Sequence, residues 1–239
     1  NMKHILMILA CASMLFASCE VDNYDMPNAQ VYGSFIDEKT GELVGTDIEN
    51  GNSIIVVELG YENPSNQYWA VMNTGEYRNN FVFSATYDIR FENCNFYPFS
   101  QNSVKIKKGG NKIDFKVTPF IRVVNPTIVK EGNTITAKFK LEAGKPEVKL
   151  SAVQLFAFSD MWVGNNVKYT LSGNTDKQSF ENVDIDPSKE YTLTIDLNAN
   201  KNSFKYTGKN YYFRIGALAS VSGVGTVRHN YSPLVKIAF

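Results

Sequence analysis

Residues 68–89, YWAVMNTGEYRNNFVFSATYDI, decide the fold class of this chain. On both sides of MNTGEY (72–77), polar residues alternate with β-branched and aromatic residues. A period of two is typical of β-strands, whose successive side chains point to opposite faces of a sheet. Asn73 and Gly75 stand between the two runs, where a tight turn needs a positive φ. We therefore expect two short strands joined by a hairpin or a strand-end turn.

The same pattern continues in both directions along the chain. Similar segments occupy residues 31–37, 53–61, 112–118, 134–142, 150–159, 168–173, 178–185, 191–197, 210–220 and 232–239. Gly, Pro, Asn and Asp separate them, and no long helical periodicity appears. The chain is therefore predicted to be all-β, with two tandem β-sandwiches over residues 31–121 and 122–239.

The boundary is placed by prolines. Within VTPFIRVVNPTIV (117–129), Pro119 and Pro126 each remove a backbone donor and restrict the residue before them, which predicts a short stiff connection. The strand count after it is typical of an immunoglobulin-like or fibronectin-like sandwich. In such a sandwich we expect a tyrosine corner. Tyr191 fits the spacing after a proline, but the strand order favours Tyr212.

An apolar run precedes these domains, in LMILACASMLFASCEVDNYD (6–25). Lys3 gives a cationic start, and no charge follows until after Cys19, as in a secretory signal. A helix of this length reaches about 20 Å, whereas a bilayer core needs about 30 Å. A cleaved signal over residues 1–18 is therefore predicted, followed by a disordered tether over 19–30. Cleavage before Cys11 is a weaker alternative, because it leaves a very short apolar core.

The residues around the predicted cut resemble the lipobox of bacterial lipoproteins. Ala17 and Ser18 precede Cys19, although Phe16 stands where Leu is usual. The resemblance implies that Cys19 is diacylated, and two or three acyl chains suffice for a stable membrane anchor. The alternative is an ordinary signal peptide with an incidental cysteine.

Acidic residues follow at once. Glu20, Asp22 and Asp25 resemble the signal that Bacteroidetes lipoproteins use for export to the outer leaflet of the outer membrane. The expected location is therefore the cell surface, with the lipid as the membrane contact. The alternative is that these charges only keep the tether solvated.

Composition excludes some classes of function. The chain holds 24 Lys+Arg and 24 Asp+Glu, so no basic field would attract nucleic acid. After processing, only Cys19 and Cys94 remain, which rules out a disulfide framework and predicts a buried Cys94.

No catalytic site, metal site or cofactor is expected. The only histidines are His4, in the signal, and His229, in a predicted loop. Glycoside hydrolysis needs only two carboxylates, and the chain has many, so the sequence leaves that class open. We nevertheless expect a protein that is not an enzyme.

Binding chemistry is concentrated in FSDMWVGNN (158–166). There Trp162 stands in a predicted loop with Asp160, Asn165 and Asn166, the mixture of aromatic and polar groups that suits a sugar. The alternative is that Trp162 covers the end of the sandwich core. The Gly-rich segment SGVGTVRHNYS (222–232) is the second candidate loop.

Two segments, GSFIDEKTGELV (33–44) and NTGEYRN (73–79), resemble the carboxypeptidase regulatory-like domain, a transthyretin-like sandwich. The matched positions are Gly33, Asp37, Thr40, Gly41 and Glu42, while Phe35 replaces the usual Val. The whole layout resembles Bacteroidetes surface lipoproteins of unassigned function from polysaccharide-utilisation loci. This resemblance implies an accessory role in polysaccharide capture, with an outer-membrane porin and a glycan-binding lipoprotein as partners. The alternative is an assembly lipoprotein that docks on such a complex and binds no ligand.

Overall fold

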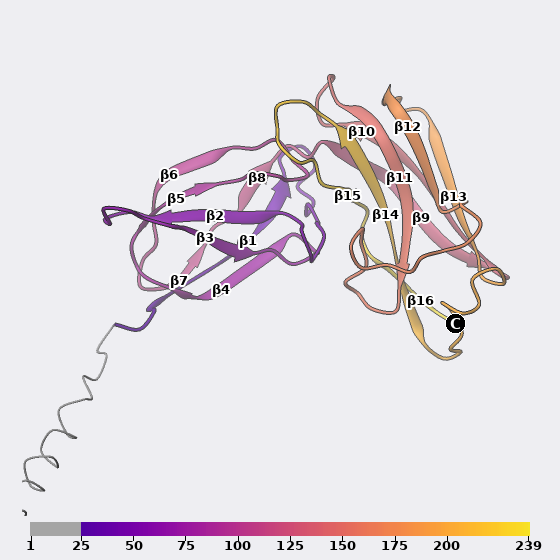
Figure 1. Cartoon of the computed structure of the whole chain (residues 1–239), viewed down its shortest axis with the longest axis horizontal. Helices are drawn as coiled ribbons and strands as arrows, with labels where there is room; N and C mark the ends of the chain where they lie inside the picture. Colours follow the sequence, from indigo (N-terminus) through magenta and orange to yellow (C-terminus); the bar gives the residue numbers. More distant parts are fainter. Residues whose placement is uncertain (1–24) are drawn as a thin grey trace, which may run out of the picture.

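The computed structural model describes residues 25–239, which form two β-sandwiches (Figure 1). The N-terminal sandwich contains β1 (Ala29–Asp37), β2 (Ser53–Glu58), β3 (Asn66–Ala70), β4 (Glu76–Val82), β5 (Thr86–Arg90), β6 (Ser100–Lys105), β7 (Gly109–Lys112) and β8 (Phe115–Val117). The C-terminal sandwich contains β9 (Ile121–Glu131), β10 (Thr134–Ala143), β11 (Lys149–Phe158), β12 (Lys177–Asp184), β13 (Glu190–Asp196), β14 (Asn210–Ser220), β15 (Asn230–Tyr231) and β16 (Val235–Ala238). The predicted all-β class is confirmed. In residues 25–239, no helix is long and apolar enough to cross a bilayer.

Each sandwich consists of two sheets. In the first, one sheet has the order β4-β1-β7, with β8 also paired to β1, and the other has the order β3-β2-β5-β6. In the second, the order β13-β10-β9 faces the order β12-β11-β14-β15, with β16 also paired to β14. The predicted signal, Cys19, Glu20 and Asp22 lie outside the described residues, whereas Asp25 is exposed.

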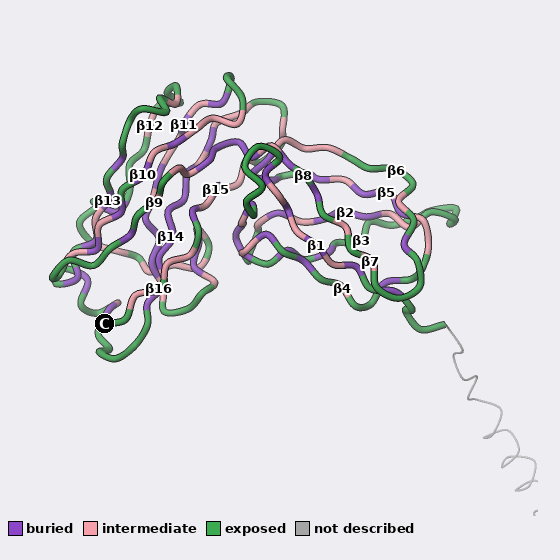
Figure 2. Tube along the Cα trace, turned by 180° about the vertical axis from the view of Figure 1, so that it is seen from behind, coloured by how far each residue is buried: buried purple, intermediate pink, exposed green. Residues whose placement is uncertain are grey.

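Aromatic side chains fill the N-terminal core. The odd-numbered positions of β1 are buried, as the alternation predicts. Phe35 lies at the centre, with its ring centroid 5.4 Å from that of Phe115 and 5.2 Å from that of Phe96. Trp69 is also buried, at 2 % exposed. Figure 2 shows that the buried positions follow the strands of both sandwiches.

The turn between β3 and β4 carries the chain from one sheet to the other. Gly75 has a φ of 90°, and its N–H donates to the Met72 carbonyl at 2.9 Å. A Cβ on Gly75 would lie 2.3 Å from the carbonyl oxygen of Val44. Only an isolated bridge between Val71 and Tyr77 joins the two strand ends, so the predicted turn is a strand-end turn.

The predicted stiff connection is shorter than expected, because only residues 118–120, which include Pro119, lie between β8 and β9. Residues 121–131 form β9, which pairs with β10 as an edge of its sheet. Pro126 does not end the strand as expected, because an edge strand tolerates a proline at a bulge. Pro126 follows Asn125, whose φ is 49°, and the register with β10 shifts opposite Lys138. Strand β1 likewise begins at Ala29, inside the predicted tether.

The C-terminal core differs from the prediction in two places. Residues 168–173 form a loop and not a strand, held to β11 by the bond from Tyr169 N to the Ala157 carbonyl at 2.9 Å. Tyr211, not Tyr212, makes the tyrosine corner: its hydroxyl accepts from the backbone N–H of Tyr206 at 3.1 Å, and it is 1 % exposed. The prediction missed the register of β14 by one residue, which inverts the side-chain direction.

Cys94 is buried, as predicted, and is 1 % exposed. Its thiol is a free one, and burial raises its pKa to about 12. At neutral pH the thiol is therefore protonated and unreactive, and the side chain packs in the core.

Candidate functional site

The two sandwiches meet at a buried polar contact, here called the domain junction. At its centre the side chain of Arg214 on β14 is 3 % exposed. It donates to two carbonyls of the N-terminal sandwich, Thr46 O at 2.9 Å and Asn73 O at 2.8 Å. Its guanidinium lies 4.0 Å from the ring centroid of Tyr231. Because these groups replace water around the charge, the arginine can stay buried.

Burial lowers the pKa of Arg214 to about 10, which still leaves it charged at neutral pH. Tyr231 and the carboxylate of Asp47, which is 5 % exposed, oppose this shift. Asp47 accepts from the hydroxyl of Tyr231 at 2.7 Å and from the backbone N–H of Asn165 at 2.7 Å. Tyr231 therefore contacts both a buried cation and a buried carboxylate at the junction, and each of these charged groups has hydrogen-bond partners.

Three buried asparagines join the sandwiches beside this pair. Asn52 donates to Asn95 Oδ1 at 2.7 Å, and Asn95 donates to the carbonyl of His229 at 2.9 Å. The side-chain amide of Asn230 donates to the backbone carbonyl of Asn95 at 2.8 Å. Amide side chains can donate and accept at once, so they satisfy backbone groups from both domains.

A buried ion pair also joins the two sandwiches. Arg122, at the start of β9, donates twice to Asp37 at the end of β1, at 2.5 Å and 2.8 Å. Its third contact is Glu142 at 3.1 Å, which also accepts from Lys39 at 2.7 Å. Burial opposes ionisation of Asp37, but the Arg122 guanidinium and the backbone N–H of Lys39 together lower the pKa of that carboxyl.

Beside the junction lies a hollow of about 380 Å³, here called the junction hollow. Its wall combines an exposed aromatic ring, Tyr68, with side chains that bind hydroxyl groups well: Asn50, Asn93, Glu92 and Arg228. Tyr68 is 64 % exposed. The remaining lining residues are Ile48, Gly51, Asn52, Ser53, Ile55, Ala70 and Val71.

Both domains contribute to this hollow. Arg228 comes from the C-terminal loop 222–229, and its backbone N–H donates to the Cys94 carbonyl at 3.0 Å. Oδ1 of Asn93 accepts a hydrogen bond from the backbone N–H of Thr226 at 2.8 Å. Asn50 and Asn93 have φ values of 52° and 54°, an uncommon backbone conformation for residues other than glycine. Such backbone strain is often found at binding sites.

A second hollow, of about 610 Å³, lies on the other side of Ile48 and Val71. Tyr32 and Arg78 line it, and the Arg78 guanidinium lies 4.9 Å from the Tyr32 ring centroid. Here the cation already covers the aromatic face, so less of that ring is open to a ligand than at Tyr68.

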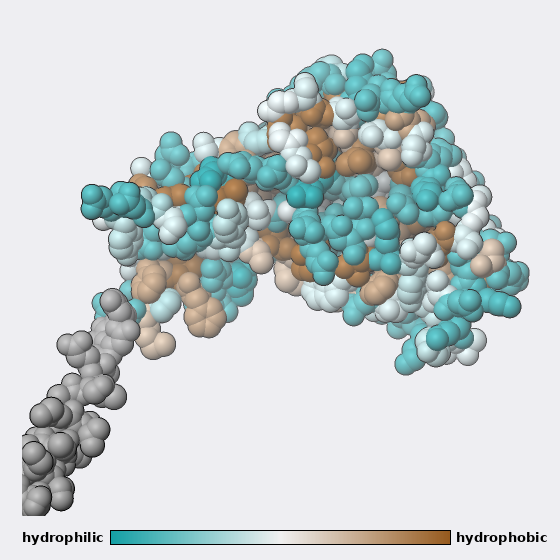
Figure 3. All heavy atoms as spheres, in the orientation of Figure 1, coloured by the Kyte–Doolittle hydropathy of each residue, from teal (hydrophilic) through white to brown (hydrophobic). Residues whose placement is uncertain are grey.

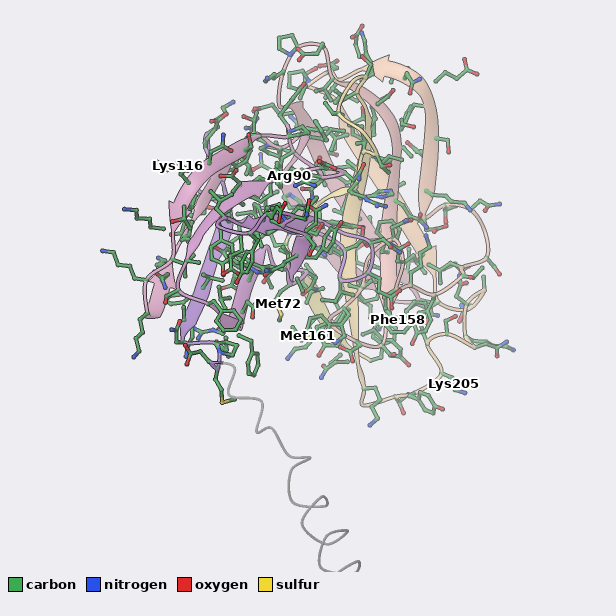
Figure 4. All side chains as sticks on the ribbon, turned by 60° about the vertical axis from the view of Figure 1, so that its left-hand side comes forward. Met72, Arg90, Lys116, Phe158, Met161 and Lys205 are labelled. Atoms are coloured by element: carbon green, nitrogen blue, oxygen red, sulfur yellow. The ribbon has the colours of Figure 1, made fainter. Side chains whose placement is uncertain are left out.

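The predicted binding loop lies at the junction. Asn165 donates its N–H to Asp47, and the Asn166 side chain donates to the Glu49 carbonyl at 2.7 Å. Asp160 is exposed and Trp162 is half-buried, and Trp162 lines neither hollow. Figure 4 shows Met161 of this loop near Met72, and Asn73 indeed donates to the Met161 carbonyl at 2.6 Å. The role of Trp162 in ligand binding stays a prediction.

The sequence did contain a sign of the junction. Arg214 interrupts the apolar run YYFRIGALAS, where a charge needs a buried partner. Tyr68 and Asn93 had no such sign, because the hollow is assembled from segments far apart in the sequence. Among residues 25–239, no three His, Cys, Asp or Glu side chains are grouped so that they could hold a metal ion.

The fold and the junction define a class of two-sandwich proteins whose domains are joined by buried polar contacts. Residues 29–118 match the family model "Protein of unknown function (DUF3823) N-terminal domain", and residues 121–236 match "Domain of unknown function (DUF3823_C)". The chain belongs to the DUF3823 family. A comparison with curated proteins gives no match.

Solved structures are similar over most of the chain. A crystal structure from Bacteroides uniformis ATCC 8492, called "a putative carbohydrate binding protein", is 62 % identical, with a TM-score of 0.86. The match covers 89 % of this chain and 100 % of that one. A DUF3823 family protein from Parabacteroides merdae ATCC 43184 is 20 % identical, with a TM-score of 0.70, over 89 % of this chain and 100 % of that one. At this lower identity the similarity shows the fold.

Proposed function

We propose that this protein is a surface lipoprotein of the outer membrane that binds polysaccharide at the junction hollow. The observation that carries the proposal is the wall of that hollow, which the exposed ring of Tyr68 shares with amide, carboxylate and guanidinium groups. Sugar rings stack their apolar faces on aromatic side chains and give their hydroxyls to planar polar groups. The name of the Bacteroides uniformis relative supports carbohydrate as the ligand class.

The domain junction supports this role by fixing the hollow. Glu92 and Asn93 come from the N-terminal sandwich and Arg228 from the C-terminal one, so a hinge between the domains would separate them. The bond from Arg228 Nε to the Asn93 carbonyl, at 3.4 Å, links the two sides directly. A preformed site loses less conformational entropy when it binds a flexible polysaccharide.

Affinity electrophoresis of the 25–239 fragment in gels that contain different glycans tests the proposal. Tyr68→Ala should reduce the retardation by about fivefold or more, because stacking contributes about 1 kcal/mol. Tyr206→Ala is the matched control, since Tyr206 is 57 % exposed and lines neither hollow. Trp162→Ala decides between the junction hollow and the loop site predicted from the sequence.

Three other outcomes would count against parts of the proposal. Equal losses from Tyr68→Ala and Tyr206→Ala would remove the junction hollow as the site. If no glycan retards the protein and an outer-membrane porin co-purifies with it, the assembly role is favoured. Mass spectrometry of the native protein tests the anchor: acyl chains on Cys19 are expected, and a free amino end at another residue would contradict them.

A further inference from the structure

The end of the N-terminal sandwich where the chain enters exposes large apolar side chains. Met26 is 82 % exposed, Phe81 is 80 % exposed and Phe83 is 40 % exposed. Figure 3 shows hydrophobic residues gathered at the end of this domain where the described chain begins. Exposed clusters of this kind mark surfaces that contact a partner. Together with Lys105, Lys107 and Lys108, these residues are here called the entry face.

Backbone hydrogen bonds hold the parts of the entry face together. The side chain of Asn28 accepts from Ser84 N at 2.8 Å, and its carbonyl accepts from Gly109 N at 2.9 Å. The N–H of Ile106 donates to the Ala85 carbonyl at 2.8 Å. The first described residues, the end of β4 and the β6–β7 loop are therefore neighbours in the fold.

A β-bulge turns the aromatic residues outward. Ala29 of β1 faces Val82 of β4, but Val31 faces Asn79, so β4 carries one extra residue between these pairs. Without the bulge, the alternation that buries Tyr77 would continue along β4, and Phe81 would point into the core. The bulge buries Val82 instead, at 3 % exposed, and leaves Phe81 in solvent. Bulges of this kind commonly re-aim a side chain at a functional surface.

The same end carries positive charge. Lys105, Lys107 and Lys108 are exposed, and none of them forms an ion pair with another residue of the described chain. The loop that presents Lys107 is held in place, because its N–H donates to Asn111 Oδ1 at 2.9 Å. Apolar side chains beside unpaired lysines are the combination that binds an anionic membrane surface.

We propose that the entry face rests on an anionic lipid surface, with Phe81 and Phe83 in the headgroup region and the lysines against lipid phosphates. The length of the preceding chain fits this occupant. Between Cys19 and Asp25 a fully extended chain reaches about 20 Å, so a lipid on Cys19 would keep the entry face near the membrane. The lipid on Cys19 belongs to the function proposed above, whereas the entry face itself can be tested without it.

The experiment uses the 25–239 fragment, which lacks Cys19, and co-sedimentation with vesicles. Binding to phosphatidylcholine vesicles that contain about a third phosphatidylglycerol is expected, with weaker binding to phosphatidylcholine alone. Phe81→Ser with Phe83→Ser should weaken binding about tenfold or more. Lys107→Gln with Lys108→Gln should weaken it about fivefold per lysine and reduce its salt dependence.

Matched controls come from the far sandwich. Tyr206→Ser removes an exposed aromatic side chain, and Lys201→Gln with Lys205→Gln removes two exposed charges. Lys205 lies on the C-terminal sandwich (Figure 4). Binding to no vesicle, or equal losses in the control variants, would overturn the proposal. So would a dimer in sedimentation equilibrium that Phe81→Ser with Phe83→Ser abolishes, since the occupant would then be a second copy. Glycan retardation of the same fragment is measured separately, so the two proposals can fail independently.

Discussion

His229 is held in its neutral form by the packing around it. Its ring lies edge-on to Phe156, with centroids 5.7 Å apart, and burial lowers its pKa to about 4. An unfolded histidine titrates near pH 6.5. Between about pH 6.5 and 4 the unfolded chain therefore binds a proton that the folded chain does not. Stability should fall as the pH falls through this window.

Urea unfolding of the 25–239 fragment at pH 7.5 and pH 5 measures this loss. We expect about 1 to 2 kcal/mol, and His229 is the only histidine of the fragment. His229→Gln should remove most of the difference between the two pH values. An equal pH dependence in wild type and variant would show that carboxylates, and not this imidazole, cause it.

Single residues explain why the junction escaped sequence analysis. Arg214 could be identified as a buried charge from the apolar residues around it. Its acceptors, however, are the carbonyls of Thr46 and Asn73, which are 168 and 141 positions away in the chain. Backbone carbonyls occur at every residue and leave no mark in a sequence. Burial could therefore be inferred, whereas the partners could not.

Among the elements, the turn between β3 and β4 depends on glycine for two separate reasons. Gly75 needs a positive φ, and its missing Cβ leaves room for the Val44 carbonyl. Gly41 also has a positive φ, of 76°, but a Cβ there would have no neighbour within 4 Å. Gly41→Ala should therefore cost about 1 kcal/mol, and Gly75→Ala about 3 kcal/mol or more.

Urea unfolding at pH 7.5 compares these two variants directly. The difference between them isolates the steric contact with Val44, because the backbone penalty is common to both. If both variants lose the same stability, the close approach of the Val44 carbonyl has no energetic weight.

Strand positions were predicted well where alternation is regular and poorly where a bulge interrupts it. β1, β10 and β13 alternate through the core, and their segments were recognised. The prolines of segment 117–129 predict a linker, whereas the structure has a bulge of β9 at Asn125 and Pro126. A bulge shifts every later side chain to the other face, and only pairing with the neighbouring strand reveals it.

At the scale of the whole molecule, the ion pair of Arg122 with Asp37 couples the sandwiches. Arg122 and Asp37 have side chains that are 9 % and 5 % exposed. Arg122→Met should destabilise the protein by about 3 kcal/mol, because it leaves a buried carboxylate without its cation. Adding Asp37→Asn to that variant should restore at least 1 kcal/mol of it, since no charge is then stranded.

A double-mutant cycle in urea, with both single variants and the double variant, measures this coupling. Strictly additive losses would mean that the two side chains do not interact energetically. The pair also has a defined pH dependence. Because Arg122 holds the pKa of Asp37 down, its contribution is present above about pH 4 and disappears as the pH falls further.

β1 also acts as a spacer. It begins at Ala29 beside the entry face and ends at Asp37 in the domain junction, and its nine residues rise about 3.3 Å each. The domain junction at Asp37 therefore lies about 30 Å from the entry face, measured along β1. Ligand would be met beyond the crowded layer next to an anchoring membrane, at a height that the length of one strand determines.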